Sequence, residues 1–224
     1  MNKFDELSST YKSILDHDVR FSGENAEYFA LYKAEYIKKY LGSNFRGRIL
    51  DYGCGVGLVI KFLRSLFDKK YVEIIGFDNS LASIKQCRNY IEGARFTSND
   101  TDLEQEFFDT VIMANVLHHI DIAERGKILK KAITFLKKGG YIFIFEHNPY
   151  NPITRMVVKS SPIDEKASLV SARDIMRLLR SLYIDIHKKR YIVFFPRLLK
   201  KLRFLEPIMG YIPIGAQYVY VGQV

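Results

Sequence analysis

A glycine-rich loop follows a short apolar run in the sequence ILDYGCGVG, residues 49–57. Gly53, Gly55 and Gly57 stand at every second position, shortly after the acidic residue Asp51. Glycine has no Cβ, so it accepts positive φ angles and lets a ligand approach the backbone closely. Loops of this kind occur where a strand turns into a helix whose N-terminus faces a nucleotide. The stretch therefore predicts a strand, a ligand-binding loop and a helix, but it does not by itself identify the nucleotide.

Strand-like and helix-like patterns alternate along the first two thirds of the chain, which is typical of β–α units around a parallel sheet. We expect strands at 48–51, 72–77, 94–97, 110–114 and 141–146, and helices at 58–67, 81–91 and 122–136. The third helix is expected to begin with a capping-box-like pair, Asp121 and Glu124. It is expected to end before Gly139 and Gly140, which suit a helix stop. The pattern predicts the α/β class.

The last third of the chain has a different pattern. A proline-bearing loop, HNPYNP at 147–152, leads to a helix that is expected to begin at Ser171, with Asp174 three residues later. Two strand-like runs follow, IDIHKKRYIVFF at 184–195 and QYVYVG at 217–222. The sequence contains no internal repeat, so we expect one domain.

Composition and length fit a single soluble domain. The 224 residues, of which 48% are hydrophobic, suffice for a substantial core. No apolar run is long enough to span a bilayer and the first ten residues are too polar for a signal peptide, so we expect a cytoplasmic protein. Cys54 and Cys87 are expected to be reduced thiols, and no metal site is predicted. The net charge of +9 favours acidic partners, although many soluble proteins carry such an excess.

Acidic residues near the loop distinguish between possible ligands. The dinucleotide fingerprint G-x-G-x-x-G needs a glycine at position 58, where this chain has Leu58. Asp51 would repel a pyrophosphate but attract a ligand that carries an ammonium and a sulfonium. Asp78 ends the second predicted strand, where a carboxylate can accept hydrogen bonds from both ribose hydroxyls of either ligand. Asp51 therefore favours S-adenosylmethionine over NAD.

Four motifs occur in an order and spacing that resemble those of the class I S-adenosylmethionine-dependent methyltransferases. They are ILDYGCGVG (49–57), IIGFDNS (74–80), FDTVIMANVLHHI (108–120) and LKKGGYIFIFE (136–146). The resemblance covers roughly residues 45–147. It implies a Rossmann-like, seven-stranded, mostly parallel sheet with an antiparallel last strand and helices on both faces. It also implies one methyltransferase domain over 1–224, with an N-terminal helical cap (1–44), a cofactor-binding core (45–147) and an acceptor-side part (148–224).

The resemblance assigns cofactor roles to the loop and to the strand ends. Gly53, Gly55 and Gly57 would border the methionine part of S-adenosylmethionine, which becomes S-adenosylhomocysteine after transfer. Asp51 would approach the ammonium of the cofactor, and Asp78 would hold its ribose.

Four further residues carry less specific assignments. Asn79 would lie beside the adenine, and the backbone of Asn115 would pass close to the methionine part. The acid that contacts adenine in this family corresponds to Asn99 or Asp100, of which Asp100 is favoured. The alternative is that Asn99 and Asp100 are turn residues and that Asn115 caps a strand end.

Methyl transfer is a direct displacement, so the enzyme must chiefly align the acceptor and exclude water. A base is needed only for hydroxyl acceptors. His118 and His119 follow the fourth predicted strand, and His119 matches a histidine common in small-molecule methyltransferases. Histidine can remove a proton from an oxygen nucleophile near neutral pH. The alternative is a histidine that shapes the pocket floor. Glu146 and His147 are weaker candidates for substrate contact.

Two sequence features bear on the acceptor. Amino-methylating enzymes of nucleic acids in this fold carry [DNS]-P-P-[YFW] after the fourth strand, where this chain reads NVLH at 115–118, so nucleic acid is an improbable partner. Tyr28, Tyr32, Tyr36 and Tyr40 recur every four residues, which indicates one helix face packed in the core rather than a substrate wall.

The stretch PRLLKKLRFLEPIMG, residues 196–210, is basic and amphipathic. It could lie on an anionic membrane or an acidic substrate, but a helix whose apolar face covers the sheet is favoured. With the loop FEHNPYNP, it resembles bacterial methyltransferases presumed to act on sugars or lipid-linked glycans. The favoured function is methyl transfer to an oxygen atom of a small-molecule, glycan or lipid acceptor. The alternatives are a nucleic-acid or protein methyltransferase and a cofactor-binding scaffold without turnover.

Overall fold

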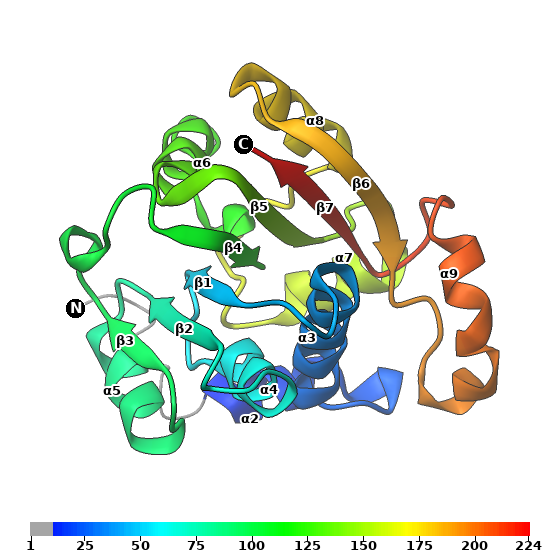
Figure 1. Cartoon of the computed structure of the whole chain (residues 1–224). Helices are drawn as coiled ribbons and strands as arrows, with labels where there is room; N and C mark the ends of the chain where they lie inside the picture. The colour runs from blue at the N-terminus through cyan, green and yellow to red at the C-terminus, as the bar shows by residue number, and fades with distance from the viewer. Residues whose placement is uncertain (1–10) are drawn as a thin grey trace.

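The computed structural model describes residues 11–224 and contains a seven-stranded mixed sheet with helices on both faces (Figure 1). The strand order is β3-β2-β1-β4-β5-β7-β6. The strands are β1 (Gly47–Tyr52), β2 (Val72–Phe77), β3 (Arg95–Thr97), β4 (Phe108–Ala114), β5 (Leu136–His147), β6 (Asp185–Ile192) and β7 (Gln217–Gln223). β1 to β5 run parallel, and β7 pairs antiparallel with β5 and β6. The predicted fold class and the antiparallel last strand are confirmed.

The helices form two layers around the sheet. Ile37, Ile60 and Cys87 come from three helices that share one buried cluster: α3 (Ala26–Leu41), α4 (Leu58–Leu66) and α5 (Leu81–Tyr90). The opposite cluster receives α6 (Arg125–Thr134) and α8 (Ala172–Ser181). Successive residues of β4, Val111 and Ile112, enter different clusters, because side chains alternate between the faces of a strand.

Several shorter elements surround the C-terminal ends of the parallel strands. They are α2 (Tyr11–Asp18), η1 (Arg20–Ser22), η2 (Asp100–Asp102), η3 (Leu117–His119), α7 (Pro152–Ser160), η4 (Arg197–Leu205) and α9 (Glu206–Met209). The described part of the predicted N-terminal cap, from residue 11, is helical; residues 1–10 lie outside the described chain. None of the helices from residue 11 onward has the length and apolar character needed to cross a bilayer.

The order of the strands fixes where a ligand can bind. β1 lies between β2 and β4, so the chain crosses over the sheet between β3 and β4. In open parallel sheets, ligands bind outside the carboxyl ends of the strands at such a switch point. Asp51, Asp78, Asn115 and Glu146 lie at or just beyond the ends of β1, β2, β4 and β5. The topology therefore collects the predicted site residues at one edge of the sheet.

The predicted boundaries of the third helix are wrong at both ends. α6 begins at Arg125, and its N-cap residue, Glu124, makes no side-chain capping bond. β5 already begins at Leu136, which pairs with Phe108 beside a bulge in the β4–β5 ladder. Gly139 and Gly140 therefore belong to the strand, because the sheet ladder outweighs the local helix-stop signal. The predicted start of α8 is confirmed: the Ser171 hydroxyl accepts a hydrogen bond from the Asp174 amide.

Three tyrosines of the stripe, Tyr32, Tyr36 and Tyr40, pack against the core, as predicted, whereas Tyr28 lines the cavity described below. Tyr36 contacts the ring of Phe145 edge-on, and Tyr40 does the same with Phe143, so the stripe holds α3 against β5. The prediction for residues 196–210 is wrong. η4 has a kink at Leu199 and buries none of its residues, so its apolar side does not cover the sheet.

Candidate active site

A cavity of about 960 Å³ lies at the carboxyl ends of the parallel strands. This volume is near the upper limit for small-molecule pockets, about 300 to 1,000 Å³, so it can hold a cofactor together with an acceptor. The strand-end side of the cavity is polar. Apolar side chains of α2, α3, α7 and the residue after α2 also line the cavity: Leu15, Val19, Phe29, Ile153 and Met156.

The glycines of the loop serve two purposes. Gly53 (φ 85°) and Gly55 (φ 53°) line the cavity in the left-handed region, where a side chain would be strained. A Cβ on Gly53 would also lie 2.6 Å from Val116. Gly57 (φ 75°) instead caps α4, and a Cβ there would lie 2.5 Å from Ile91. Gly57 is therefore required by packing against α5 and lies behind the cavity wall.

The two cysteines support the same loop. Both are free, as predicted, and both thiols lie near the carbonyl oxygen of Gly55, with the Cys87 Sγ 3.3 Å away. A hydrogen bond to Cys87 and burial raise the pKa of the Cys54 thiol well above its usual value. A thiol that stays protonated is a poor nucleophile, so Cys54 acts as a small packing residue.

Asp51 and Lys33 place opposite charges inside the cavity, and both are almost fully buried. Burial and the nearby Asp78 raise the pKa of Asp51 to about 7, although Lys33 opposes them. Burial lowers the pKa of Lys33 to about 8, although Glu146 and Asp51 oppose it. The Asp51 Oδ1 atom has no hydrogen-bond partner among the described residues. A ligand with an ammonium and a carboxylate would supply the missing partners.

Asp78 is tied to the loop as well as facing the cavity. Its carboxylate accepts hydrogen bonds from the amides of Gly55 (2.8 Å) and Ser80 (2.9 Å). Asn79 and Asp100 also line the cavity. Asn99 caps η2 by accepting a hydrogen bond from the Thr101 amide and does not line the cavity. Of the two alternatives for the adenine-side acid, the structure brings Asp100 to the site.

Asn115 has an unusual backbone conformation at the end of β4. Its φ angle of 61° lies in the left-handed region, which asparagine tolerates better than most residues. Its backbone N–H donates a hydrogen bond to the Phe145 carbonyl oxygen on the neighbouring strand. Its side-chain Nδ2 has no partner among the described residues. Asn115 lines the cavity, so this strained turn presents an unsatisfied donor to a ligand.

His118 is locked between two carboxylates. Its Nδ1 lies 2.6 Å from Glu146 Oε2, and its Nε2 lies 3.3 Å from Asp164 Oδ1. The second oxygen of Glu146 accepts the Leu117 amide, which fixes η3 on β5. Burial opposes the charged imidazolium, but Glu146 and Asp164 outweigh it and raise the pKa of His118 to about 9. His118 is therefore held as a cation whose two N–H groups are both in use.

His119 is the more accessible neighbour. Its Nε2 lies 3.4 Å from Asp164 Oδ1, its side chain is 18% exposed, and it lines the cavity. His147 completes the group, since burial and the positive charge of His118 lower its pKa to about 3 and keep it neutral. His118, His147 and Asp164 place potential ligand atoms within 4.8 Å of one another.

Comparisons with known proteins agree with this geometry. A family model described as "Methyltransferase domain" matches residues 24–182, well over half of the chain. The chain belongs to the class I S-adenosylmethionine-dependent methyltransferases.

Individual relatives are distant. The carboxy-S-adenosyl-L-methionine synthase of Aliivibrio fischeri is 26% identical over 162 residues, which cover 64% of this methyltransferase and 66% of that protein. This chain thus spans just under two thirds of the length of that curated relative.

Two solved structures show the shared fold. A SAM-dependent methyltransferase from Archaeoglobus fulgidus has a TM-score of 0.69 at 17% identity, covering 89% of this chain and 95% of the other. A geranyl diphosphate C-methyltransferase from Streptomyces coelicolor A3(2), in complex with Mg²⁺, geranyl diphosphate and S-adenosyl-L-homocysteine, has a TM-score of 0.61 at 16% identity, covering 86% and 78%. At these identities the two likenesses show the fold alone.

The residues present fit the family cofactor. The orphaned Oδ1 of Asp51 and Nδ2 of Asn115, together with two glycines at positive φ, form a cradle of the kind that a zwitterionic ligand requires. Lys33 and Asp164 were not anticipated as site residues. Lys33 had a detectable signal, since it shares the buried face of α3 with Ala26, Ala30 and Ile37. Asp164 lies in the segment between α7 and α8, and no local pattern places it beside His118.

The loop after β5 is held firmly by hydrogen bonds to the segment before β7. Asn148 is fully buried, and its Nδ2 donates to the carbonyl oxygens of Pro213 (3.0 Å) and Gly215 (2.8 Å). Asn151 caps α7 by accepting the Thr154 amide. Asn148 is thus committed to joining this loop to the segment before β7.

Proposed function

We propose that this methyltransferase methylates a hydroxyl oxygen of a small-molecule, sugar or lipid-linked glycan acceptor. The observation that carries the proposal is the position of His119 on the cavity wall with its Nε2 beside Asp164. A histidine held by a carboxylate and open to the cavity suits proton removal from a hydroxyl group.

Residues at the strand ends would hold the cofactor. When bound, S-adenosylmethionine supplies an electrophilic methyl group on a sulfonium. Asp51 would face its ammonium and Lys33 its carboxylate, since these are the buried charges of opposite sign in the cavity. Asp78, whose carboxylate is oriented by the Gly55 and Ser80 amides, would accept hydrogen bonds from the ribose hydroxyls. Asn79 and Asp100 would lie on the adenine side.

The two adjacent histidines would have different roles. A neutral His119, with its Nε2 beside the Asp164 carboxylate, would accept the hydroxyl proton on its imidazole ring. His118 has both ring nitrogens beside carboxylates, so we assign it a positioning role. As a fixed cation, it would hold Asp164 in place for His119.

The character of the cavity supports an acceptor with an apolar part. Phe29, Ile153 and Met156 contribute apolar side chains to the lining of the cavity. An apolar wall lowers the free energy of an acceptor that carries a hydrocarbon group and excludes water around the reacting atoms.

The test is a methyl-transfer screen with purified protein, S-adenosylmethionine and acceptors grouped by chemistry: free hydroxylated small molecules, sugars, lipid-linked glycans, nucleic acids and proteins. We expect S-adenosylhomocysteine to form with a hydroxylated acceptor from one of the first three groups, and NAD to leave the melting temperature unchanged. Turnover only with nucleic acid or protein would contradict the proposal. Mass spectrometry of the cofactor would also reveal a carboxylated product, the outcome that the name of the Aliivibrio relative suggests.

A further inference from the structure

Residues 196–214 carry their apolar side chains on the outside of the molecule. Leu198 is 92% exposed, Phe204 73% and Ile208 76%. In an ordinary surface helix such residues face the core, because burying a large apolar side chain contributes roughly 1.5–3 kcal/mol. These exposed side chains do not contribute that stabilisation to the fold. Their exposure suggests that a partner outside the described chain covers them.

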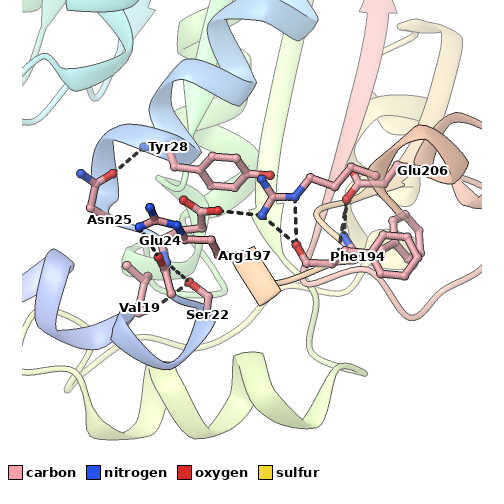
Figure 2. A network of polar contacts seen from close by, with 11 residues as sticks. Val19, Ser22, Glu24, Asn25, Tyr28, Phe194, Arg197 and Glu206 are labelled. Carbon is pink, nitrogen blue, oxygen red and sulfur yellow. Dashed lines mark hydrogen bonds and ion pairs between the residues drawn. The ribbon is translucent and has the colours of Figure 1, made fainter. Parts of the chain in front are cut away.

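The inward side of the same segment is polar. It forms polar contacts with the residues before α3 and at the start of that helix (Figure 2). Arg203 forms an ion pair with Glu24 at 2.7 Å and lies over the ring of Tyr28. Glu206 is 6% exposed and accepts hydrogen bonds from the Tyr32 hydroxyl and the Phe194 amide. These contacts fix the orientation of the segment, so its apolar side chains cannot turn inward without breaking a partly buried ion pair and the hydrogen bonds of Glu206.

Exposed apolar residues of the loop after β5 and of α7 extend this area. Asn151, at the start of α7, donates to the carbonyl oxygen of Ile214 at 2.7 Å, and Asn148 bonds Pro213, so these segments lie side by side. We call the combined area the apolar surface. It comprises Leu198, Phe204, Ile208, Tyr211, Ile212, Ile214, Tyr150, Ile153 and Met156, all of them exposed.

The charge around the apolar surface has one sign. Between residues 186 and 214 the only acidic residue is Glu206, which is buried. The exposed ionisable side chains beside the apolar residues are basic: Arg197, Lys200 and Lys201 on η4, and Arg155 and Lys159 on α7. Apolar side chains among lysines and arginines are the pattern of a surface that enters the headgroup region of an anionic bilayer. A second copy of the chain would bring like charges together, which disfavours self-association through this face.

The apolar surface adjoins the mouth of the active-site cavity. Ile153 and Met156 line the cavity while more than half of each side chain remains exposed, and Phe195 and Pro196 line it where the C-terminal segment begins. A bilayer in contact with the apolar surface would therefore lie against the entrance through which an acceptor reaches His119.

We propose that the apolar surface docks on an anionic lipid bilayer and opens the cavity toward the headgroups. The docking stands on the exposed residues alone. That the acceptor is then a lipid or lipid-linked glycan drawn from the membrane rests on the proposed function.

The test is co-sedimentation of the full chain with vesicles of phosphatidylcholine, with and without phosphatidylglycerol. We expect binding to the anionic vesicles that weakens as salt is added, and a loss of roughly tenfold or more when Leu198→Ser, Phe204→Ser and Ile208→Ser are combined. The matched control combines Tyr90→Ser, Ile122→Ser and Tyr183→Ser, which remove equally exposed residues elsewhere and should leave binding unchanged.

Two further measurements keep the outcomes separate. Lys200→Gln with Lys201→Gln should weaken binding to anionic vesicles only. Calorimetric affinity for S-adenosylhomocysteine should be the same in wild type and in the Leu198, Phe204 and Ile208 variant, so a failure of docking would not be mistaken for a failed cofactor site. Absence of vesicle binding, equal binding to both vesicle types, or a dimer in solution that the triple substitution abolishes would overturn the proposal.

Discussion

The imidazole of His118 and the carboxylate of Glu146 lie 2.6 Å apart, both almost entirely excluded from solvent. Glu146 also fixes the position of the loop that follows β4, because its other oxygen accepts a hydrogen bond from the Leu117 amide. On its far side His118 meets Asp164, which also contacts His119. The pair thus connects the stability of the fold to the orientation of the proposed base.

Protonated His118 should stabilise the protein up to mildly alkaline pH. Its pKa rises from 6.5 to about 9 in the folded chain, so the stabilisation is complete below pH 6.5 and is lost as the pH rises through about 9. The shift corresponds to a loss on the order of 3 kcal/mol. Denaturant unfolding of wild type and His118→Gln should show the gap between their free energies of unfolding narrowing from pH 7 to 10.

The contribution of His118 must be taken from the difference in free energy of unfolding between wild type and His118→Gln, because Lys33 has the opposite effect on the stability of both proteins. Its pKa is lowered to about 8, so its burial costs less stability as the pH rises from 8 toward 10.5. This contribution is common to wild type and variant and cancels in the gap. A gap that stays constant across the range would mean that His118 is neutral in the fold.

Lys33 should matter for the amino-acid part of the cofactor and not for its nucleoside. Lys33→Met removes the cation proposed to face the carboxylate, a charge-assisted contact of about 1.5–3 kcal/mol, so affinity for S-adenosylhomocysteine should fall roughly 10- to 150-fold. Calorimetry with 5′-methylthioadenosine, which lacks the carboxylate, should show no change. Lys39→Met, an exposed position on the same helix, is the control. Equal losses for both ligands would place Lys33 elsewhere in the site.

The sequence predicts the part of this site that local chemistry determines. Gly53, Gly55 and Asp78 follow from the requirements of a strand–loop–helix turn and of a ribose, and the structure brings all three to the cavity. The resemblance carried by the four motifs likewise implies the seven-stranded sheet with its antiparallel last strand, which the structure confirms.

The remaining residues depend on contacts between distant segments. Asp164 and His118 are far apart in the sequence and meet only in the folded chain, and such a separation leaves no periodic signal. The inverted orientation of residues 196–210 has the same origin. Their alternation of apolar and basic residues predicts an amphipathic helix, but the ion pair of Arg203 with Glu24 decides which side faces inward.

Gly57 should be required for stability rather than for ligand binding. Gly57→Ala adds a Cβ at positive φ and 2.5 Å from Ile91, so the free energy of unfolding should fall by roughly 2–4 kcal/mol. Gly42→Ala is the control, because its φ is also positive (86°) but nothing lies within 4 Å of the added atom. Chemical denaturation should therefore show a larger loss at Gly57. A folded Gly57→Ala protein that loses affinity for S-adenosylhomocysteine at unchanged stability would return this glycine to the ligand-contacting set.

The last prediction concerns the chemical role of His119. If it removes the proton of a hydroxyl acceptor, His119→Ala should lower kcat about 10²- to 10⁴-fold and leave cofactor affinity unchanged. Activity of the wild type should fall toward acidic pH as the imidazole becomes protonated, and this limb should be absent from the residual activity of the variant. His119→Asn distinguishes a base from a structural residue, because asparagine keeps a polar group that can form a hydrogen bond but cannot accept the proton. Steady-state kinetics on the acceptor found in the screen should show His119→Asn as impaired as His119→Ala. Asp164→Asn should share part of the loss in kcat, since it weakens the contact that orients the ring. Full activity of the asparagine variant would show that His119 only shapes the pocket, and the acceptor atom would then be one that needs no base.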